Sequence, residues 1–485
     1  MRRARHLFRR GFLLLLAALT GGCTSLPPER GVAGAVAPAP GVIWTPPPEA
    51  KKPPEATPGA APVFPSEVVH KGSILTLSQA IDLSLRNSPA TREAWFKARA
   101  AAAEVGVKSG AFLPALELGA NITRQKQAAL GGTVTILNTS YGPSLSMNWL
   151  LLDAGGRSAD IDEARAALYA SDWLHDAAIQ DLVLQVETAY YGYLYGKALV
   201  AAQEASVTSA TQSLAAADER HRAGVATIAD VLLARTAASQ ARLDLASAEG
   251  LVRTIRGALA TQLGVPANIP VEAGELPEIE NLDSVSESVD RLIEKAAAER
   301  PDLAARRLDV SKAEAHVRSV RAAGLPALYA LGSIGRNTFD THTGTNGVNV
   351  YSGSLLMRFP IFSGFSNAYD VKKAQEEVKA ARADAEDLTN RVILQVWTSY
   401  SAVRTASQRV RAARDLLASA RQSQEVASGR YKAGVGGILD LLAAQSAFAG
   451  ARAQEVQARS EWYLAMAQLA HDVGALGPAE VERKP

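Results

Sequence analysis

The hydrophobic positions along the chain recur with a helical period over long stretches. From residue 158 to residue 221 there is no proline, and apolar residues keep this period. At 1.5 Å of rise per residue, such a helix is about 95 Å long. The chain is expected to turn at a tip over residues 222–227 and to return as a second helix over residues 228–263. The pattern therefore predicts a long helical hairpin.

Before the long helix, the pattern changes to strict alternation, which is typical of a half-buried β-strand. Leu116, Leu118, Ala120 and Ile122 alternate with polar or small residues, and a second alternating run follows a Gly-Gly loop. We expect a two-stranded hairpin over about residues 115–151. Strands of roughly ten residues are expected, which is the strand length of transmembrane barrels.

The whole pattern occurs twice, which indicates an internal duplication. Repeat 1 covers residues 71–265 and repeat 2 covers residues 289–475, with a connecting segment over residues 266–288. Repeat 2 has its own β-hairpin over about residues 327–361 and its own tip over residues 432–437. From the long helix onward, the two copies match at a constant offset of 210 residues. The chain is thus predicted to hold four strands in two helix–β-hairpin–long helix–helix repeats.

The N-terminal region is expected to direct export rather than to join the fold. Residues 1–23 combine an arginine-rich start, a short apolar run and small residues before Cys23, as in a signal peptide. Small residues before the only cysteine are similar to a lipoprotein cleavage box. They predict lipidation of Cys23 by acyl chains such as palmitate, and a plain signal cut nearby is the alternative. Proline and alanine make residues 24–70 an extended tether, and residues 476–485 form a C-terminal tail.

Charge and composition exclude several functions. The net charge is +2 over 485 residues, which gives no electrostatic case for nucleic acid. With one cysteine and no ligand spacing among the seven histidines, we expect neither a metal site nor a cofactor. We find no phosphate-binding glycine loop and no nucleophile–base constellation in the sequence, so we expect that the chain is not an enzyme.

Four strands per chain require partner chains. An open sheet edge in a bilayer would leave backbone groups unsatisfied, and four strands cannot close a barrel. Two copies would give eight strands and three copies twelve, and only the larger number leaves an open lumen. Lateral packing of the helices into a tube that continues from the barrel would bury their apolar stripes. The predicted fold class is a membrane β-barrel joined to a long α-helical barrel, with a 12-stranded barrel in a trimer.

Several motifs together resemble those of the TolC-type outer-membrane efflux proteins, over roughly residues 75–475. One motif runs from Phe359 to Gly364 at a strand-to-helix junction, and another is the pair of Gly-Val tips with an aspartate six residues after the glycine. The resemblance implies a homotrimer with a 12-helix coiled-coil tunnel in the periplasm. It also implies a lipid-anchored place in a Gram-negative outer membrane, as in the OprM-like branch. The implied partners are a periplasmic adaptor protein, an inner-membrane pump and outer-membrane lipid.

The resemblance also assigns roles to the two tips, where the adaptor would dock. Turn chemistry is the alternative for these glycines, because glycine readily adopts positive φ. The implied docking residues are Arg220, Gly224, Val225, Arg430, Gly434 and Val435.

By the same resemblance, Tyr431, Asp440 and Asp230 would hold the periplasmic entrance of the tunnel closed. A three-fold ring of Asp440 would favour cations, and the alternative is a helix-start aspartate that interacts with the helix dipole. The second tip departs from the family pattern. Gly436-Gly437 stands where relatives can carry an arginine, and Ala443 stands where some carry a second aspartate. We therefore expect a closed-state lock that is weaker or rebuilt from other residues.

The alternating hairpins also carry aromatic residues that would form a girdle at the membrane surface, or would serve ordinary strand packing. These residues are Tyr141, Trp149, Tyr351 and Phe359.

Taken together, the patterns predict a trimeric outer-membrane channel of a tripartite efflux or export system. The alternative is a lipid-anchored periplasmic coiled-coil scaffold without a pore. The alternating, serine-rich hairpins argue against the scaffold, because a coiled-coil rod is built from helices and does not require β-hairpins. The wall of the channel does not identify the transported substrate.

Overall fold

The computed structural model describes residues 74–129, 134–283, 287–341 and 344–476, all of which lie in one compact unit. The signal peptide, the Cys23 lipidation site, the tether and the tail beyond residue 476 lie outside the described residues. In chain order the elements are β1 (Ile74–Leu75), α4 (Leu77–Asn87), α5 (Pro89–Gly110), β2 (Ala115–Ala129), β3 (Val134–Leu152), α6 (Gly156–Arg222), α7 (Ile228–Gln262), β4 (Glu272–Ala273), α8 (Val289–Glu299), α9 (Pro301–Ala322), β5 (Ala327–Thr341), β6 (Gly344–Arg358), α10 (Ser366–Lys432) and α11 (Ile438–Asp472).

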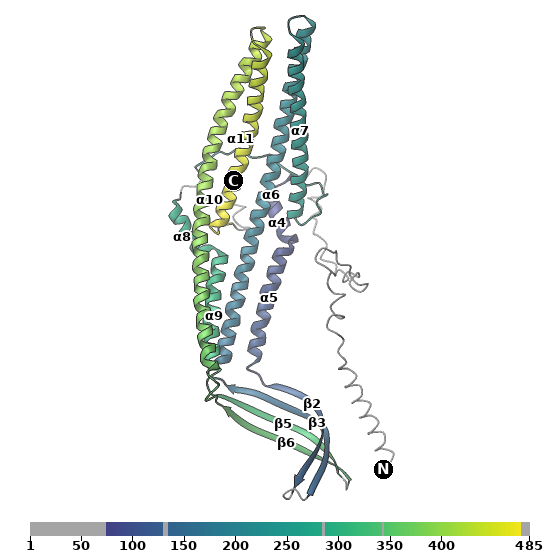
Figure 1. The fold of residues 1–485 in the computed structure, drawn as a ribbon, viewed down its shortest axis with the longest axis vertical. Coiled ribbons are helices and arrows are strands. Elements are labelled where there is room, and N and C mark those ends of the chain that lie inside the picture. The colour runs from purple at the N-terminus through teal and green to yellow at the C-terminus, as the bar shows by residue number, and fades with distance from the viewer. Residues whose placement is uncertain (1–73, 130–133, 284–286, 342–343, 477–485) are drawn as a thin grey trace, which may run out of the picture. The chain divides into compact units, whose positions relative to one another are not determined.

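The four long strands form one antiparallel sheet in the order β2-β3-β5-β6 (Figure 1). Each strand has 15 to 19 residues, so our expectation of roughly ten residues was too short. The expectation counted only the alternating apolar stretch. Backbone pairing continues past it through polar residues, as where Gln125 pairs with Asn138, because the ladder hydrogen bonds do not depend on side-chain polarity.

The register of the sheet gathers most of the apolar residues of the central part of the strands on one face. Directly opposed residues of neighbouring strands share a face, and Leu118, Leu145, Ile334 and Tyr351 lie opposite one another in turn. One position along, the middle of the other face is small or polar, and apolar residues such as Leu331 and Val350 lie nearer its two ends. In that middle part Glu117 and three serines are opposed in the same way, at Ser146, Ser333 and Ser352.

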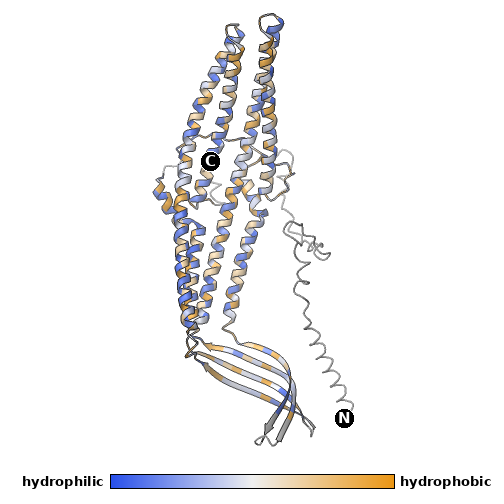
Figure 2. Cartoon of the chain, viewed as in Figure 1, coloured by the Kyte–Doolittle hydropathy of each residue, from blue (hydrophilic) through white to orange (hydrophobic). Residues whose placement is uncertain are grey.

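The helices form a layer whose members run side by side. The two long helices, α6 and α10, have 67 residues each. Near the strands α5 and α9 flank α6, and α9 also packs against α10. Toward the tips α7 and α11 take their places, so the lateral order is α5/α7, α6, α9/α11, α10 (Figure 1). Polar and apolar residues are mixed along these helices (Figure 2). None of the helices in the described ranges has the length and the apolar character needed to cross a bilayer.

The short helices meet end to end at two tightly packed glycines. Gly264, just past the end of α7, has a φ of +71°. A Cβ atom on it would lie 2.5 Å from the Cβ atom of Asn87, where α4 gives way to α5. Gly474 repeats this arrangement after α11, with a φ of +82° and the backbone of Arg300 at 3.1 Å. Only glycine supplies both the left-handed turn and the close approach.

The segment between the repeats ties three helices together across the middle of the layer. The Lys197 ammonium of α6 donates a hydrogen bond of 2.5 Å to the segment's backbone. Arg459 of α11 donates another, at 2.7 Å. The Arg411 guanidinium of α10 donates to both carboxylate oxygens of Asp283, at 2.7 and 2.8 Å. The segment therefore joins α6 of repeat 1 to α10 and α11, the two helices that meet at the second tip.

A charged contact strengthens the same level. The ring of His471, near the end of α11, lies 2.9 Å from Asp181 of α6 and 3.2 Å from Asp472. Burial lowers the pKa of His471, but the hydrogen bonds and charges of these two aspartates outweigh burial and raise the pKa to about 9. The imidazolium is therefore the stable form at neutral pH, and it links repeat 1 to repeat 2.

Candidate functional site

The two helical tips share one turn geometry. Gly224 and Gly434 have φ values of +74° and +79°. The N–H groups of Val225 and Val435 each donate a 3.0 Å hydrogen bond to the carbonyl five residues earlier. This is the hydrogen-bond pattern with which glycine ends a helix. The glycines thus have a conformational role, and the valine side chains beside them are 64% and 69% exposed.

The helices that leave the two tips begin differently. Before α7, the Thr227 N–H donates to the Asp230 carboxylate at 2.9 Å, and the Asp230 N–H donates to the Thr227 hydroxyl at 3.3 Å. This reciprocal pair is a capping box. At the matching position before α11 stands Gly437, which offers no side-chain cap. The start of α7 is therefore capped by side chains of the first tip, whereas the start of α11 has no side-chain cap.

This difference separates the two predicted gate aspartates. The Asp230 carboxylate caps α7. Asp440 occupies the same position in repeat 2 but is exposed. Within the described part of the chain, its carboxylate makes no hydrogen bond or ion pair. Of these two aspartates, Asp440 is thus the one whose carboxylate has no partner.

Tyr431, the third predicted gate residue, lies inside the contact between the two helical hairpins. It is only 5% exposed and packs with Ala217, Val231 and Leu441, among other residues. Burial raises the pKa of its phenol, the Arg220 guanidinium opposes this rise, and the Asp230 carboxylate adds to it. Tyr431 therefore belongs to a small apolar cluster between the hairpins, and the charge of the Asp230 carboxylate reaches its phenol.

Arg220, which the sequence predicted as a docking residue, also joins this cluster. Its Nη1 atom donates a 2.6 Å hydrogen bond to the backbone carbonyl of Tyr431. Its guanidinium carbon lies 4.7 Å from the centre of the Tyr431 ring. We did not predict this contact, because the two residues are 211 positions apart and no local sequence pattern indicates it.

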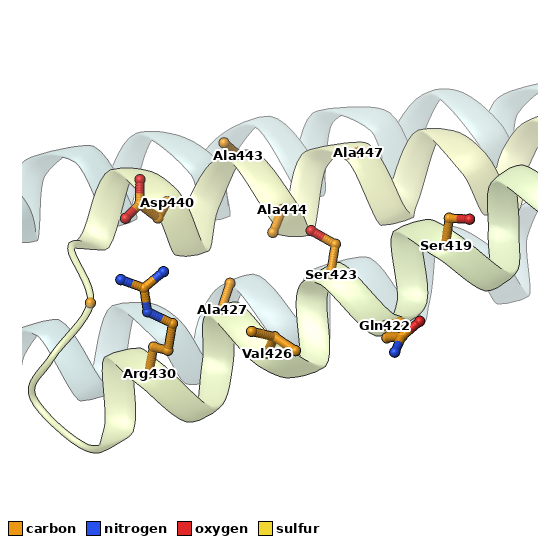
Figure 3. Close-up of a pocket in the computed structure, with 11 residues that line it drawn as sticks. Ser419, Gln422, Ser423, Val426, Ala427, Arg430, Asp440, Ala443, Ala444 and Ala447 are labelled. Carbon is orange, nitrogen blue, oxygen red and sulfur yellow. The ribbon is translucent and has the colours of Figure 1, made fainter.

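Arg430, at the position in repeat 2 that matches Arg220, lies elsewhere. It lines a groove of about 690 Å³ between α10 and α11. Figure 3 shows its guanidinium facing the side of the groove from which Asp440 extends. Alanines and small polar residues form the rest of the lining: Ser419, Gln422, Ser423, Ala427, Ala443, Ala444 and Ala447, with Val426 and Gly436.

The glycine pair of the second tip has a packing reason. A Cβ atom on Gly436 would lie 3.0 Å from the Cβ atom of Arg430 and 3.1 Å from the backbone nitrogen of Tyr431. Any side chain there would push the start of α11 away from α10. The glycine at this position therefore allows the start of α11 to pack closely against the end of α10.

The four aromatic residues predicted for a girdle are exposed on the strands or beside them. Tyr141 and Tyr351 lie on the apolar face of the sheet, Tyr141 toward the hairpin turn and Tyr351 at the middle of β6. Trp149 and Phe359 lie at the helix end of β3 and just after β6, and the Trp149 indole N–H donates a 2.8 Å hydrogen bond to the Phe112 carbonyl. Tyr141 and Trp149 are eight residues apart on one strand, which is about 27 Å at ~3.4 Å per residue.

Within the described ranges, no three His, Cys, Asp or Glu side chains are placed so that they could hold a metal ion.

Comparisons with known proteins agree with the duplicated architecture. Residues 80–265 and 292–475, one stretch in each repeat, match the sequence model of a family described as outer membrane efflux protein. Protein CyaE of Bordetella pertussis is 29% identical over 416 residues, which cover 85% of this chain and 86% of CyaE. Outer membrane protein OprJ of Pseudomonas aeruginosa is 27% identical over 376 residues, which cover 76% of this chain and 78% of OprJ. The structure of the outer-membrane channel OprN superimposes with a TM-score of 0.74 at 19% identity, over 83% of this chain and 90% of that chain. At this identity the likeness concerns the fold.

Proposed function

Because the chain belongs to the family of outer membrane efflux proteins, we propose that it works as a homotrimer in a tripartite assembly. Its partners in that assembly would be an inner-membrane pump and a periplasmic adaptor. The protein is an outer-membrane channel of an efflux or export system. The observation that carries the proposal is the four-stranded sheet with two unpaired edges, continued by a layer of long helices.

Family membership confirms three expectations from the sequence. These are the resemblance itself, the duplicated repeat with four strands per chain, and the expectation that the chain is not an enzyme. The alternative of a pore-free periplasmic scaffold is correspondingly disfavoured, because the family consists of channels.

The free edges of the layer support closure by identical copies. β2 and β6 lie at opposite edges of the sheet, and they run in opposite directions because the order alternates. The β6 edge of one copy can therefore pair with the β2 edge of the next in the antiparallel manner of every other pair. Three copies give twelve strands, a number that leaves a lumen. The same rotation brings α10 of one copy beside α5 and α7 of the next.

The two faces of the sheet suit this arrangement. The apolar face would meet lipid, and the face with Ser146, Ser333 and Ser352 would line the pore. The spacing of Tyr141 and Trp149 along β3 is close to the roughly 25 Å height of the apolar band in such barrels. We propose that Tyr141 marks one border and that Trp149 and Phe359 mark the other. Tyr351 is level with Leu145, midway between Tyr141 and Trp149, and would face lipid inside the band.

The remaining assignments concern anchoring and docking. Lipidation of Cys23 would add an anchor in the outer membrane. The exposed valines of the tips, Val225 and Val435, would meet the adaptor, with Gly224 and Gly434 shaping the turns. Arg430, which lines the groove, would contribute a positive charge to docking.

The oligomer and its conductance test this function. The purified full-length protein is expected to run as a heat-modifiable trimer in detergent and to give single-channel currents in planar lipid bilayers. Removal of residues 1–70 should leave both properties intact, since the strands and helices of the described residues all lie from Ile74 onward. A truncated protein that is a stable, water-soluble monomer would instead support the scaffold.

The free charge of Asp440 leads to a prediction about channel block. In a trimer, three copies of Asp440 would form a negative ring that attracts multivalent cations. We expect Asp440→Ala to raise the concentration of a trivalent cation that half-blocks the current by about tenfold, because attraction between such charges is on the order of 1 kcal/mol in water. The measurement is a blocker titration on single channels.

Glu219→Gln is the matched control for this titration. Glu219 is also an acid at a tip, but it pairs with Arg222 at 2.8 Å, and we expect its replacement to leave the block unchanged. An unchanged block in Asp440→Ala would remove Asp440 from the constriction.

A further inference from the structure

The contact between α9 and α6 shows how one repeat packs against the other inside a chain. The Ser319 hydroxyl of α9 donates a hydrogen bond to the Asp160 carboxylate of α6. One turn away, the His316 ring of α9 lies 3.1 Å from the Glu163 carboxylate of α6. This boundary between repeats is therefore polar and directional.

The duplication assigns a counterpart to each residue of this boundary. Helices α5 and α9 have 22 residues each and begin at Pro89 and Pro301, an offset of 212 residues. Helices α6 and α10 have 67 residues each and begin at Gly156 and Ser366, an offset of 210 residues. If α5 of one copy packs against α10 of the next as α9 packs against α6, the counterparts of two residues in contact will meet across the boundary between copies.

One face of α5 has the apolar character of a covered surface but is open in the single chain. Its residues are spaced by four, three and four positions, which places them on one side of a helix. Phe96, Ala100, Ala103 and Val107 are all exposed, Phe96 by 55% and Val107 by 66%. In contrast, Ala315, the counterpart of Ala103 on α9, is 1% exposed. Repeat 2 thus buries a position that repeat 1 leaves uncovered.

The charges beside this face are complementary to those of α10, with the acid and the base exchanged. Inside the chain, the base His316 is on α9 and the acid Glu163 is on α6. Their counterparts are the acid Glu104 on α5 and the base Lys373 on α10. A pair of opposite sign is therefore available at the boundary between copies, in the reverse orientation.

Both of these charged side chains are accessible in the single chain. The side chains of Glu104 and Lys373 are 54% and 75% exposed. Each has an ion-pair partner on its own helix, but the distances are long, at 3.6 Å to Lys108 and 3.7 Å to Glu377. Exposed pairs of this kind contribute little, so they do not prevent a contact with a neighbouring copy.

The closest approach of the two helices also has a counterpart. A Cβ atom on Gly156, at the start of α6, would lie 3.3 Å from the Cβ atom of Ala322, at the end of α9. The counterparts are Ser366 on α10 and Gly110 on α5, so the glycine again occupies one side of the approach. A Cβ atom on Gly110 would meet no described atom within 4 Å. The end of α5 therefore has room for the serine of a neighbour.

We propose that this face of α5 recognises α10 of a second copy of this chain, through an ion pair between Glu104 and Lys373 of that copy. The inference rests on the proposed homotrimer and names the residues that select the neighbour. The exchanged charges also disfavour a wrong neighbour, because a second α9 on α10 would bring His316 and Arg318 toward Lys372 and Lys373. The charges thus make repeat 1 and repeat 2 alternate around the assembly.

Disulfide linking of the full-length protein in detergent tests this surface. Oxidation of the double variant Gly110→Cys, Ser366→Cys is expected to give covalent trimers on a denaturing gel. The equivalent Cβ positions inside the chain are 3.3 Å apart, close to the roughly 3.8 Å of a disulfide. Each single variant should remain unlinked, although all of them retain Cys23.

The matched control combines Ser366→Cys with Ala103→Cys. Ala103 lies on the same face of α5 but seven residues before Gly110, which is about 10 Å along the helix, so no linked trimer is expected. Linking of the control pair instead, or a protein that runs as a trimer before denaturation but does not link through Gly110→Cys, would overturn the proposed surface. A protein that is monomeric in detergent would contradict the homotrimer and this surface with it.

Exchange of the two charges tests the ion pair itself. Glu104→Lys and Lys373→Glu are each expected to raise the dissociation constant of the detergent-solubilised trimer about hundredfold, from about fivefold at each of three boundaries. The double variant restores opposite charges and should recover most of the wild-type value. Light scattering of the protein on dilution measures the dissociation.

Lys379→Glu is the control for the charge exchange. The Lys379 side chain is 69% exposed and pairs with Glu376 at 3.0 Å. It lies six residues from Lys373, which is about 120° around α10, so its reversal should leave the trimer as stable as the wild type. Single variants at Glu104 and Lys373 that match this control, or a double variant as weak as either single one, would overturn the ion pair.

Discussion

Replacing Arg157 by methionine is expected to lower the free energy of unfolding by about 3–5 kcal/mol, the usual cost of breaking a buried ion pair. The Arg157 side chain is 8% exposed and lies 3.2 Å from the Asp153 carboxylate. Its Nη1 atom donates to the carbonyls of Leu150, at 2.6 Å, and Ala111, at 3.2 Å. Its Nη2 atom donates to the carbonyl of Leu151 at 3.1 Å.

The size of this effect follows from where Arg157 lies. The end of α5, the end of β3 and the start of α6 all meet at its guanidinium, which also lies 4.3 Å from the centre of the Phe112 ring. Methionine fills a similar space but donates no hydrogen bond. Its introduction therefore removes the Arg157 donors of three carbonyls at the junction between helices and strands. Among the described residues, the partly buried Asp153 carboxylate then keeps only the backbone N–H of residue 157, at 2.6 Å.

Thermal unfolding of the detergent-solubilised protein, followed by circular dichroism, measures this prediction. The control is Arg165→Met on the same helix, because Arg165 is 57% exposed and its ion pair with Asp162 is long, at 3.9 Å. Surface changes of this kind stay within about 0.5 kcal/mol. Equal unfolding temperatures for the two variants would show that Arg157 does not hold the junction.

The architecture was accessible from the sequence because two periods and one repeat offset determine it. The change from helical to alternating spacing at Leu116 separated helix from strand, and the glycines at 224 and 434 marked both turns. Arg157 was not accessible in this way. The counterpart of Arg157 in repeat 2 is Asn367, so the repeat does not indicate its role. Arg157 stabilises the protein through carbonyl groups that only the folded backbone brings together.

The tips contain one feature that the sequence pattern predicts and one that it does not. The difference between Asp230 and Asp440 was visible in the sequence, because threonine precedes the first by three positions and glycine precedes the second. A capping box is a local pattern, and it predicts which aspartate keeps a free charge. The contact of Arg220 with Tyr431 depends on the packing of α6 against the second hairpin. No local pattern encodes such packing.

Gly264→Ala is expected to destabilise the protein by about 2–5 kcal/mol, from two costs that add. A left-handed conformation costs a residue with a Cβ atom roughly 1–2 kcal/mol, and Gly264 has a φ of +71°. Forcing an extra carbon into a packed site costs about 1–3 kcal/mol. The new Cβ atom would lie 2.5 Å from the Cβ atom of Asn87 and 3.3 Å from its carbonyl oxygen.

Relief of this clash would separate the end of α7 from the end of α4, at the level where the repeats are held together. The Asn87 side chain donates a 3.2 Å hydrogen bond to the Leu263 carbonyl, and Ser84 donates one of 2.7 Å to the Gln262 carbonyl. Both bonds depend on the close approach that Gly264 permits. The expected result is a loss of stability that spreads along α7 rather than a local adjustment.

Gly250→Ala is the matched control, and it should change stability in the opposite direction. Gly250 lies inside α7, and a Cβ atom there would meet nothing within 4 Å. Alanine in a helix interior is favoured over glycine by roughly 0.5–1 kcal/mol. Unfolding temperatures that move in opposite directions would place the constraint at the junction with Asn87. A fall for both variants, or a rise for both, would mean that α7 responds to added side chains along its whole length and that the junction has no special role.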